Sequence, residues 1–219
     1  MNKITDRAAA FNPDCVLCPR IANNLSLVKK LYPNYHCGPV APFGADQPSL
    51  LIIGLGPGLH GANATGRPFT GDHAGILLYQ MLHDFGFSNQ AVSQDRKDGL
   101  KLTRCRITNA VKCLPPANKP LPEEIRTCNS YLQSELAPLR GRLVMIALGR
   151  IAHEAVLRAL GLKPKDHPFS HNALHQLSDQ RSLLDSYHCS RYNTQTRRLT
   201  EPMFRQIFSR ARSIIDGHA

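Results

Sequence analysis

The chain has 219 residues, enough for one domain with a core of its own. It carries 27 Lys and Arg residues against 16 Asp and Glu, a formal net charge of +11 that favours a polyanionic partner such as nucleic acid. No stretch has the length and apolarity of a membrane span, and the first residues lack the apolar region of a secretory signal. These features exclude a membrane protein, and we expect a cytoplasmic chain whose cysteines stay reduced.

In chain order, residues 1–14 predict a loose tail, and residues 19–49 a short helix followed by a proline-rich segment. Strands are predicted at 50–53, 107–111, 143–148 and 183–187, and the uninterrupted apolar run at 143–148 is typical of a central parallel strand. Helical periodicity predicts helices over 74–85, 122–136, 151–160 and from the cap Thr200 onward, with loops at 87–101 and 162–182. Because strands alternate with helices, we expect one α/β domain over 1–219, a three-layer αβα sandwich around a central parallel four-stranded sheet.

The segment that follows the first strand, residues 54–72, is the most informative one. It is rich in glycine and contains two prolines, which excludes a continued strand or an ordinary helix. In an open α/β sheet, a glycine-rich loop at the carboxyl end of a strand lets backbone amides approach a ligand closely. This loop brings Phe69 and Asp72 to that edge.

Two later strands also end in polar groups, Asn109 and His188. An aromatic ring, an amide and an imidazole at one sheet edge suit a flat heterocycle with polar edges. Each residue also has an ordinary explanation: Asn109 as a turn residue, His188 as a loop histidine, Phe69 as core, and Asp72 as a helix cap. The conjunction favours a binding site.

The cysteines separate into two sets. Cys15 and Cys18 form a C-x2-C pair, and Cys113 and Cys128 form a distant second pair, so four thiolates could hold zinc or an iron–sulfur cluster. The proline-flanked loops and the long spacing favour a [4Fe–4S] cluster. The other three cysteines, Cys37, Cys105 and Cys189, are expected to be small buried hydrophobes. Cys37 is a weaker alternative candidate for a metal ligand.

Taken together, residues 54–72 (GLGPGLHGANATGRPFTGD), 108–113 (TNAVKC) and 186–191 (SYHCSR) form a joint signature, extended by 193–194, 198–200 and the cysteine spacing. On these motifs, over roughly residues 15–208, the chain resembles the uracil-DNA glycosylase superfamily, and most closely its family 5, the type b enzymes. The resemblance implies hydrolysis of the N-glycosidic bond of a deaminated base that is flipped out of DNA. The bases implied are uracil, hypoxanthine and xanthine.

The resemblance also implies residue roles. Phe69 stacks on the base, Asn109 recognises it and His188 stabilises negative charge on the leaving base. Leu55 stands where type a enzymes carry an acidic residue, so the task of orienting water moves to Asp72. Gly54, Leu55 and Gly56 line the base site, and the [4Fe–4S] ligands are those of the two cysteine pairs: Cys15, Cys18, Cys113 and Cys128.

The family commonly has alanine at Gly56 and Gly58, arginine at Ala64 and proline at Cys189. These departures concern the shape of the site and the stiffness of the loop after His188. The remaining expectations are a monomer associated with the nucleoid of a bacterial-type cell, and phosphate contacts from three arginines: Arg191, Arg197 and Arg198.

Two other functions fit parts of the sequence. Residues 56–61 match G-x-G-x-x-G, which would indicate a nucleotide-cofactor oxidoreductase, but Asn63, Gly66 and Pro68 oppose the helix that this motif needs. A non-catalytic iron–sulfur DNA-binding protein would share the charge and the cysteines. His171 and His175, which have no acidic partner nearby in sequence, predict a polar loop.

Overall fold

The computed structural model describes residues 10–217, and its centre is one six-stranded sheet in the order β1-β3-β2-β4-β6-β5. The inner strands β3, β2, β4 and β6 are parallel to one another, whereas β1 and β5 pair antiparallel at the two edges. The strands are β1 (Phe43–Gly44), β2 (Leu50–Gly54), β3 (Cys105–Asn109), β4 (Leu143–Leu148), β5 (Leu174–Ser178) and β6 (Arg181–Ser186).

The α/β fold is confirmed, and the four expected strands correspond to β2, β3, β4 and β6, but the sheet has six strands rather than four, because both edge strands were missed. β1 has only two residues, and β5 is a polar, partly exposed strand with no apolar run to reveal it. For the same reason the segment 162–182, expected to be irregular, contains β5 and the start of β6. Edge strands contact the core on one side only, so their sequences need not be apolar.

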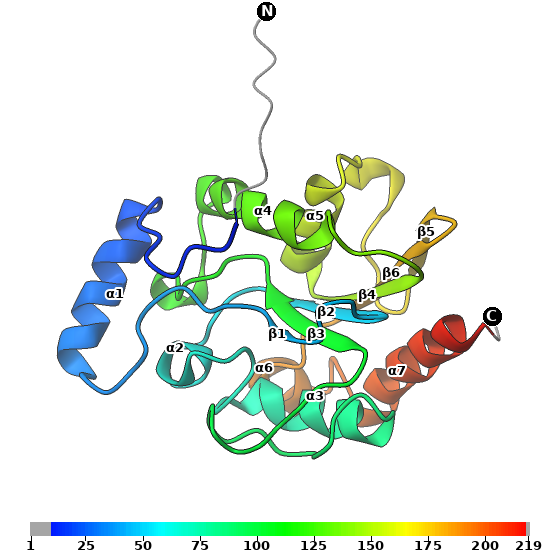
Figure 1. Cartoon of the computed structure of the whole chain (residues 1–219), viewed down its shortest axis with the longest axis horizontal. Helices are drawn as coiled ribbons and strands as arrows, with labels where there is room; N and C mark the ends of the chain where they lie inside the picture. Colours follow the sequence, from blue (N-terminus) through cyan, green and yellow to red (C-terminus); the bar gives the residue numbers. More distant parts are fainter. Residues whose placement is uncertain (1–9, 218–219) are drawn as a thin grey trace, which may run out of the picture.

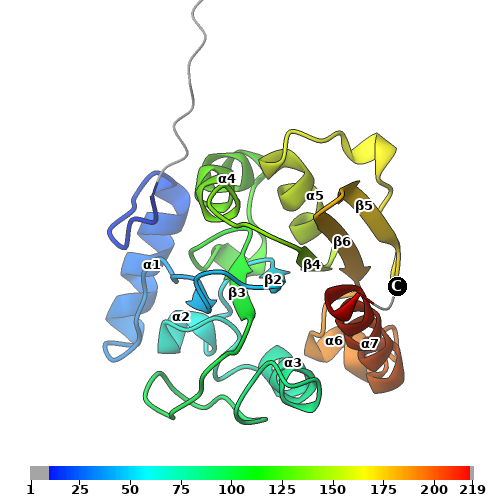
Figure 2. The ribbon, with the colours of Figure 1, turned by 45° about the vertical axis from the view of Figure 1, so that its right-hand side comes forward.

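Helices cover both faces of the sheet (Figures 1 and 2), with α4 and α5 on one face and α3 and α7 on the other. The helices are α1 (Pro19–Leu31), α2 (Ala62–Thr65), α3 (His73–Asp84), α4 (Pro122–Leu136), α5 (Arg150–Ala159), α6 (Arg191–Gln195) and α7 (Glu201–Asp216), with 3-10 turns η1 (Pro116–Asn118) and η2 (Pro164–Asp166). Thr200 caps α7 as expected, because its side chain accepts from the Met203 N–H. The glycine-rich segment contains one helical turn, α2, which Gly66 ends in the left-handed conformation.

The alternation of side chains along the central strands builds two cores. Leu50 and Ile52 of β2 face the core under α3 and α7, and Leu51 and Ile53 face the core under α4 and α5. All four are fully buried, which explains why the strand is apolar without interruption.

The N-terminal region packs against one end of the sheet. α1 contributes Ile21 and Leu25 to a third apolar cluster, which also contains Val111 and Cys128. Of the expected tail 1–14, residues 1–9 lie outside the described residues, and residues 10–14 carry no helix or strand. Within residues 10–217 no helix is long and apolar enough to cross a membrane.

Candidate active site

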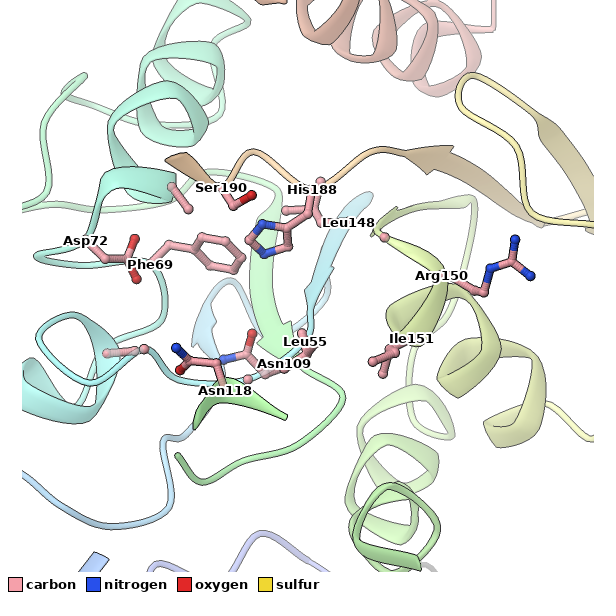
Figure 3. Close-up of a pocket in the computed structure, with 15 residues that line it drawn as sticks. Leu55, Phe69, Asp72, Asn109, Asn118, Leu148, Arg150, Ile151, His188 and Ser190 are labelled. Carbon is pink, nitrogen blue, oxygen red and sulfur yellow. The ribbon is translucent and has the colours of Figure 1, made fainter. Parts of the chain in front are cut away.

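A cavity of about 480 Å³ lies at the carboxyl ends of the parallel strands (Figure 3), within the range of roughly 300–1,000 Å³ usual for small-molecule sites. Each inner strand supplies a part of its wall: the loop after β2, Asn109 ending β3, Leu148 ending β4 and His188 after β6. Its principal polar and aromatic side chains are Phe69, Asp72, Asn109, Asn118, Arg150, His188 and Ser190.

Asn109 presents an unpaired amide oxygen to this cavity. The residue is 2 % exposed, and its Oδ1 has no hydrogen-bond partner in the part of the chain that the structure describes. A buried amide without a partner carries a desolvation penalty, so this atom is placed to meet a donor on a ligand. Gly54 makes room for it, because a Cβ there would overlap Asn109 Oδ1 and lie 2.6 Å from Phe69 Cζ.

The Phe69 ring forms the apolar side of the cavity. Its backbone is left-handed, with φ of 55°, a conformation that costs energy for an aromatic residue. A Cβ at Gly75 would overlap the Phe69 carbonyl oxygen, so this close backbone approach requires glycine. The Phe69 and His188 rings are 5.9 Å apart, centroid to centroid, with 27° between their planes.

The two carboxylate oxygens of Asp72 have different surroundings. Oδ1 accepts a hydrogen bond of 3.0 Å from the Gly75 N–H and caps α3. Oδ2 faces Gly58 and Gly61, and a Cβ at Gly61 would overlap the carboxylate. Burial raises the pKa of Asp72, and backbone N–H groups at the start of α3 partly oppose this.

His188 is neutral at physiological pH, because burial lowers its pKa to about 4. The loop around it is fixed by two contacts: the Asn193 side chain donates to the His188 carbonyl at 2.8 Å, and the Cys189 thiol donates to the Ala74 carbonyl at 3.4 Å. The second contact ties this loop to the start of α3, next to Asp72.

The structure brings most of the expected base-site residues together. Leu55, Gly56, Phe69, Asp72, Asn109 and His188 all line the cavity, with Gly54 beneath Asn109 and Phe69. Sequence reasoning missed Asn118 and Arg150. Asn118 lies in the proline-rich turn after Cys113, and Arg150 begins the helix after β4, so the rule that ligands bind beyond strand ends could have found the latter.

The four expected cluster ligands, Cys15, Cys18, Cys113 and Cys128, line one small cavity between α1 and α4. Burial raises the pKa of Cys18 to about 11 and of Cys113 to about 12, and the neighbouring thiols contribute to both shifts. Four adjacent thiols, one of them buried and three half-buried, are a donor set that a metal centre would stabilise as thiolates.

The spacing of these sulfurs can be compared with that of a zinc site. Tetrahedral zinc holds its four sulfurs about 3.8 Å apart, given Zn–S bonds of about 2.3 Å. Within residues 10–217, no three of these four sulfurs lie within 4.8 Å of one another.

The remaining cysteines lie apart from this group. Cys105 and Cys189 are fully buried, as expected of small hydrophobes. Cys37 accepts a hydrogen bond from the Asn63 side chain at 3.6 Å and lines a neighbouring surface hollow with Cys15.

The three expected DNA-contacting arginines are exposed in and after α6. The Arg198 guanidinium lies 4.7 Å from the centre of the Tyr187 ring, which directly precedes His188. Arg197 lines a surface groove between α3 and α6. Ser190, which caps α6, lines the cavity, so Arg191 follows directly on a cavity residue.

His171 and His175 were expected to lie in a polar loop without an acidic partner, and for His175 this was wrong. His175 lies on β5, and its Nε2 is 3.0 Å from the buried carboxylate of Asp185. The other carboxylate oxygen is 2.7 Å from His153 Nδ1, while His153 Nε2 lies 2.8 Å from the His167 carbonyl. This pairing attaches the 162–173 segment to β6, three residues before His188.

Fold and cavity together define an α/β domain with a cavity at the carboxyl edge of a mostly parallel sheet, lined by an aromatic ring, an amide, a carboxylate and an imidazole. Comparison with known proteins gives the family: the model of the uracil DNA glycosylase superfamily matches residues 41–212. The chain belongs to that superfamily, which confirms the resemblance seen in its sequence motifs.

Several relatives are similar over most of the chain. A Type-5 uracil-DNA glycosylase of Thermus thermophilus is 45% identical over 91% of this chain and 93% of its own length. A Type-5 uracil-DNA glycosylase of Pyrobaculum aerophilum is 39% identical over 90% of this chain and 88% of its own. A Type-4 uracil-DNA glycosylase of Archaeoglobus fulgidus is 32% identical over 55% of this chain and 53% of its own.

Proposed function

We propose that this chain is a DNA-repair glycosylase of family 5, which flips uracil, and also hypoxanthine and xanthine, out of DNA and hydrolyses the N-glycosidic bond. The observation that carries the proposal is the unpaired Asn109 amide oxygen beside Phe69, facing a cavity that also holds Asp72 and His188. The Type-5 relatives support the activity on uracil. The cavity volume of about 480 Å³ supports the inclusion of bicyclic bases.

The base is bound through one ring face and one polar edge. Phe69 stacks on the extruded ring, and Asn109 Oδ1 accepts from a ring N–H of the base. Uracil, hypoxanthine and xanthine all carry such an N–H beside a carbonyl. These contacts offset the few kcal/mol that unstacking costs.

Hydrolysis produces a base that gains negative charge and a sugar that becomes positive, and His188 acts on the base while Asp72 acts on the sugar. The bond between C1′ and the base nitrogen breaks with its electron pair leaving on the base, while a water oxygen bonds to C1′. Neutral His188 donates a hydrogen bond to the base oxygen that gains negative charge. Asp72 Oδ2 orients the water, accepts its proton and stabilises the positive sugar.

We propose a [4Fe–4S] cluster on Cys15, Cys18, Cys113 and Cys128. When bound, it supplies a cross-link between the N-terminal segment and the sheet rather than a redox step, since its ligands come from segments far apart in sequence. Anaerobically purified protein should be brown, absorb broadly near 400 nm and contain about four irons per chain. Zinc at one equivalent without iron would refute this assignment.

DNA is held chiefly through phosphates. Arg191, Arg197 and Arg198 are exposed in and after α6, whose cap Ser190 lines the cavity, and the chain carries a net charge of +11. The protein is proposed to act as a monomer on DNA that contains deaminated bases.

The deciding experiment is base excision. Purified protein is incubated with single-stranded and duplex oligonucleotides that carry one uracil, hypoxanthine or xanthine, and abasic sites are cleaved with alkali. Cleavage of the uracil strand is expected, and its absence would refute the glycosylase function in favour of a non-catalytic iron–sulfur DNA-binding protein. Cleavage of uracil alone would refute only the wider base range.

A further inference from the structure

A fully buried lysine lies directly behind the base-recognition residue. Lys112, at 1 % exposure, comes three residues after Asn109, and its ammonium makes three short contacts. Its Nζ is 2.6 Å from Thr108 Oγ1, 2.8 Å from the Asn109 carbonyl oxygen and 2.6 Å from Glu135 Oε1 of α4. Burying a charged lysine requires such compensation, so these contacts fix its position.

The ammonium acts on the backbone of Asn109, which matters because the side-chain oxygen has no partner of its own within residues 10–217. Among the described residues, no hydrogen bond to the side-chain oxygen therefore holds it in the orientation that a base needs. The Asn109 carbonyl lies at the end of β3, and the Ala110 N–H of the same peptide donates to the Gly54 carbonyl at 2.9 Å. A charged donor on that carbonyl fixes the peptide from which the amide projects.

The backbone of Lys112 also contacts one of the four clustered cysteines. The Lys112 backbone N–H donates to Cys128 Sγ at 3.2 Å, and its carbonyl accepts from the Val40 N–H at 2.7 Å. Both the main chain and the side chain of Lys112 are thus held, and neither can shift without moving the end of β3.

We propose that Lys112, held by Glu135, is a positioning residue for base excision, which sets the orientation of the Asn109 amide through its backbone carbonyl. This inference rests on the proposed glycosylase function. A lysine that only stabilised the core could be replaced together with its counter-charge without loss of activity. A positioning lysine could not, because a displacement of about 1 Å at a recognition group can lower a rate about 100-fold.

The test separates the two roles by restoring stability without restoring the ammonium. In Lys112→Met alone, the Glu135 carboxylate is left buried and unpaired, so stability falls. In Lys112→Met/Glu135→Met, both charges are removed and replaced by apolar side chains of similar length, a change that is often neutral for stability. Thr108→Val is the matched control, because it removes another contact of the same ammonium and spares the Asn109 carbonyl.

Single-turnover uracil excision is measured per folded molecule, with the folded fraction from circular dichroism, alongside binding to undamaged duplex. We expect the double variant to unfold within a few degrees of the parent, to bind undamaged duplex equally, and to excise uracil 10- to 100-fold more slowly. Thr108→Val should stay within about threefold of the parent. If the double variant does not fold, Lys112→Gln/Glu135→Gln is measured with the same expectation.

Two results would be informative in different ways. A folded double variant that excises uracil at the parental rate would overturn the positioning role and leave the glycosylase function intact. A parent protein that excises no uracil would refute the proposed function itself, before any variant is compared.

Discussion

Replacing Gly54 with alanine tests whether the base site depends on the missing side chain at the end of β2. The added Cβ would overlap Asn109 Oδ1 and lie 2.6 Å from Phe69 Cζ and 2.8 Å from Phe69 Cε2. Neither neighbour can retreat easily, since Asn109 is 2 % and Phe69 6 % exposed. The methyl group would therefore displace the two groups assigned to the base.

The size of the effect follows from overpacking. Forcing one carbon into a filled core costs about 1–3 kcal/mol, which for a chain of this length lowers the melting temperature by roughly 2–12 °C. Excision should fall much further than stability, by about 100-fold, because displacement of the recognition amide by about 1 Å acts on the rate directly. Binding to undamaged DNA should be unchanged, since the arginines lie outside the cavity.

Gly58→Ala is the matched control. Its Cβ would lie 3.6 Å from Asp72 Oδ2, an ordinary contact, and alanine is common at this position in family 5. We expect the Gly58 variant to melt within about 2 °C of the parent and to excise uracil within about threefold. Parental excision by Gly54→Ala, measured in single turnover, would refute the assignment of Asn109 and Phe69 to the base.

Five further predictions address the chemistry, the pH dependence of stability, the cluster and the DNA. Asp72→Asn should lower single-turnover uracil excision at least about 100-fold, with lesion-DNA binding and iron content retained; parental excision would contradict the catalytic assignment. The excision rate should fall in acid with an apparent pKa above 3.8, the ordinary pKa of Asp, because Asp72 must ionise. No inflection is expected near pH 6.5, because His188 stays neutral down to about pH 4. The free energy of unfolding should fall as the pH drops from about 6.5 toward 4, since the unfolded His188 imidazole binds a proton first; a flat titration would argue against its burial. Cys128→Ala should lower iron content and stability, and Cys105→Ala should leave iron intact. Arg197→Ala should weaken binding to all DNA sequences alike and reduce the slope of log affinity against log salt by about one, whereas a loss confined to one sequence would indicate base contact.

The parts of the fold that sequence predicts best are those buried on both sides. The strand at Leu143–Leu148 was predicted with its observed bounds, because a central parallel strand must be apolar throughout. The edge strand at Leu174–Ser178 leaves no such pattern, because its residues are polar or partly exposed and only one of its sides pairs, with β6.

In the candidate site, too, some residues could be predicted from the sequence and others could not. Residues at strand ends, such as Asn109, were predictable because topology brings strand ends together. Lys112 was not, because a lysine in sequence indicates an exposed side chain unless its partners are known. Its carboxylate partner Glu135 lies on a different element, 23 positions later, and only folding brings the two charges within 2.6 Å.

The two explanations of Asp72, helix cap and catalytic group, are compatible in the folded chain because each uses a different oxygen. Oδ1 is fixed by the Gly75 N–H, so Oδ2 is held in one orientation before any substrate binds. Burial raises the pKa of this carboxyl despite the backbone donors, so the carboxylate lies in a poorly solvated site. A negative charge acts more strongly there than in water on a sugar that becomes positive. In the proposed reaction, the cap therefore fixes the carboxylate before the substrate binds, and glycine at position 61 leaves the space that this orientation requires.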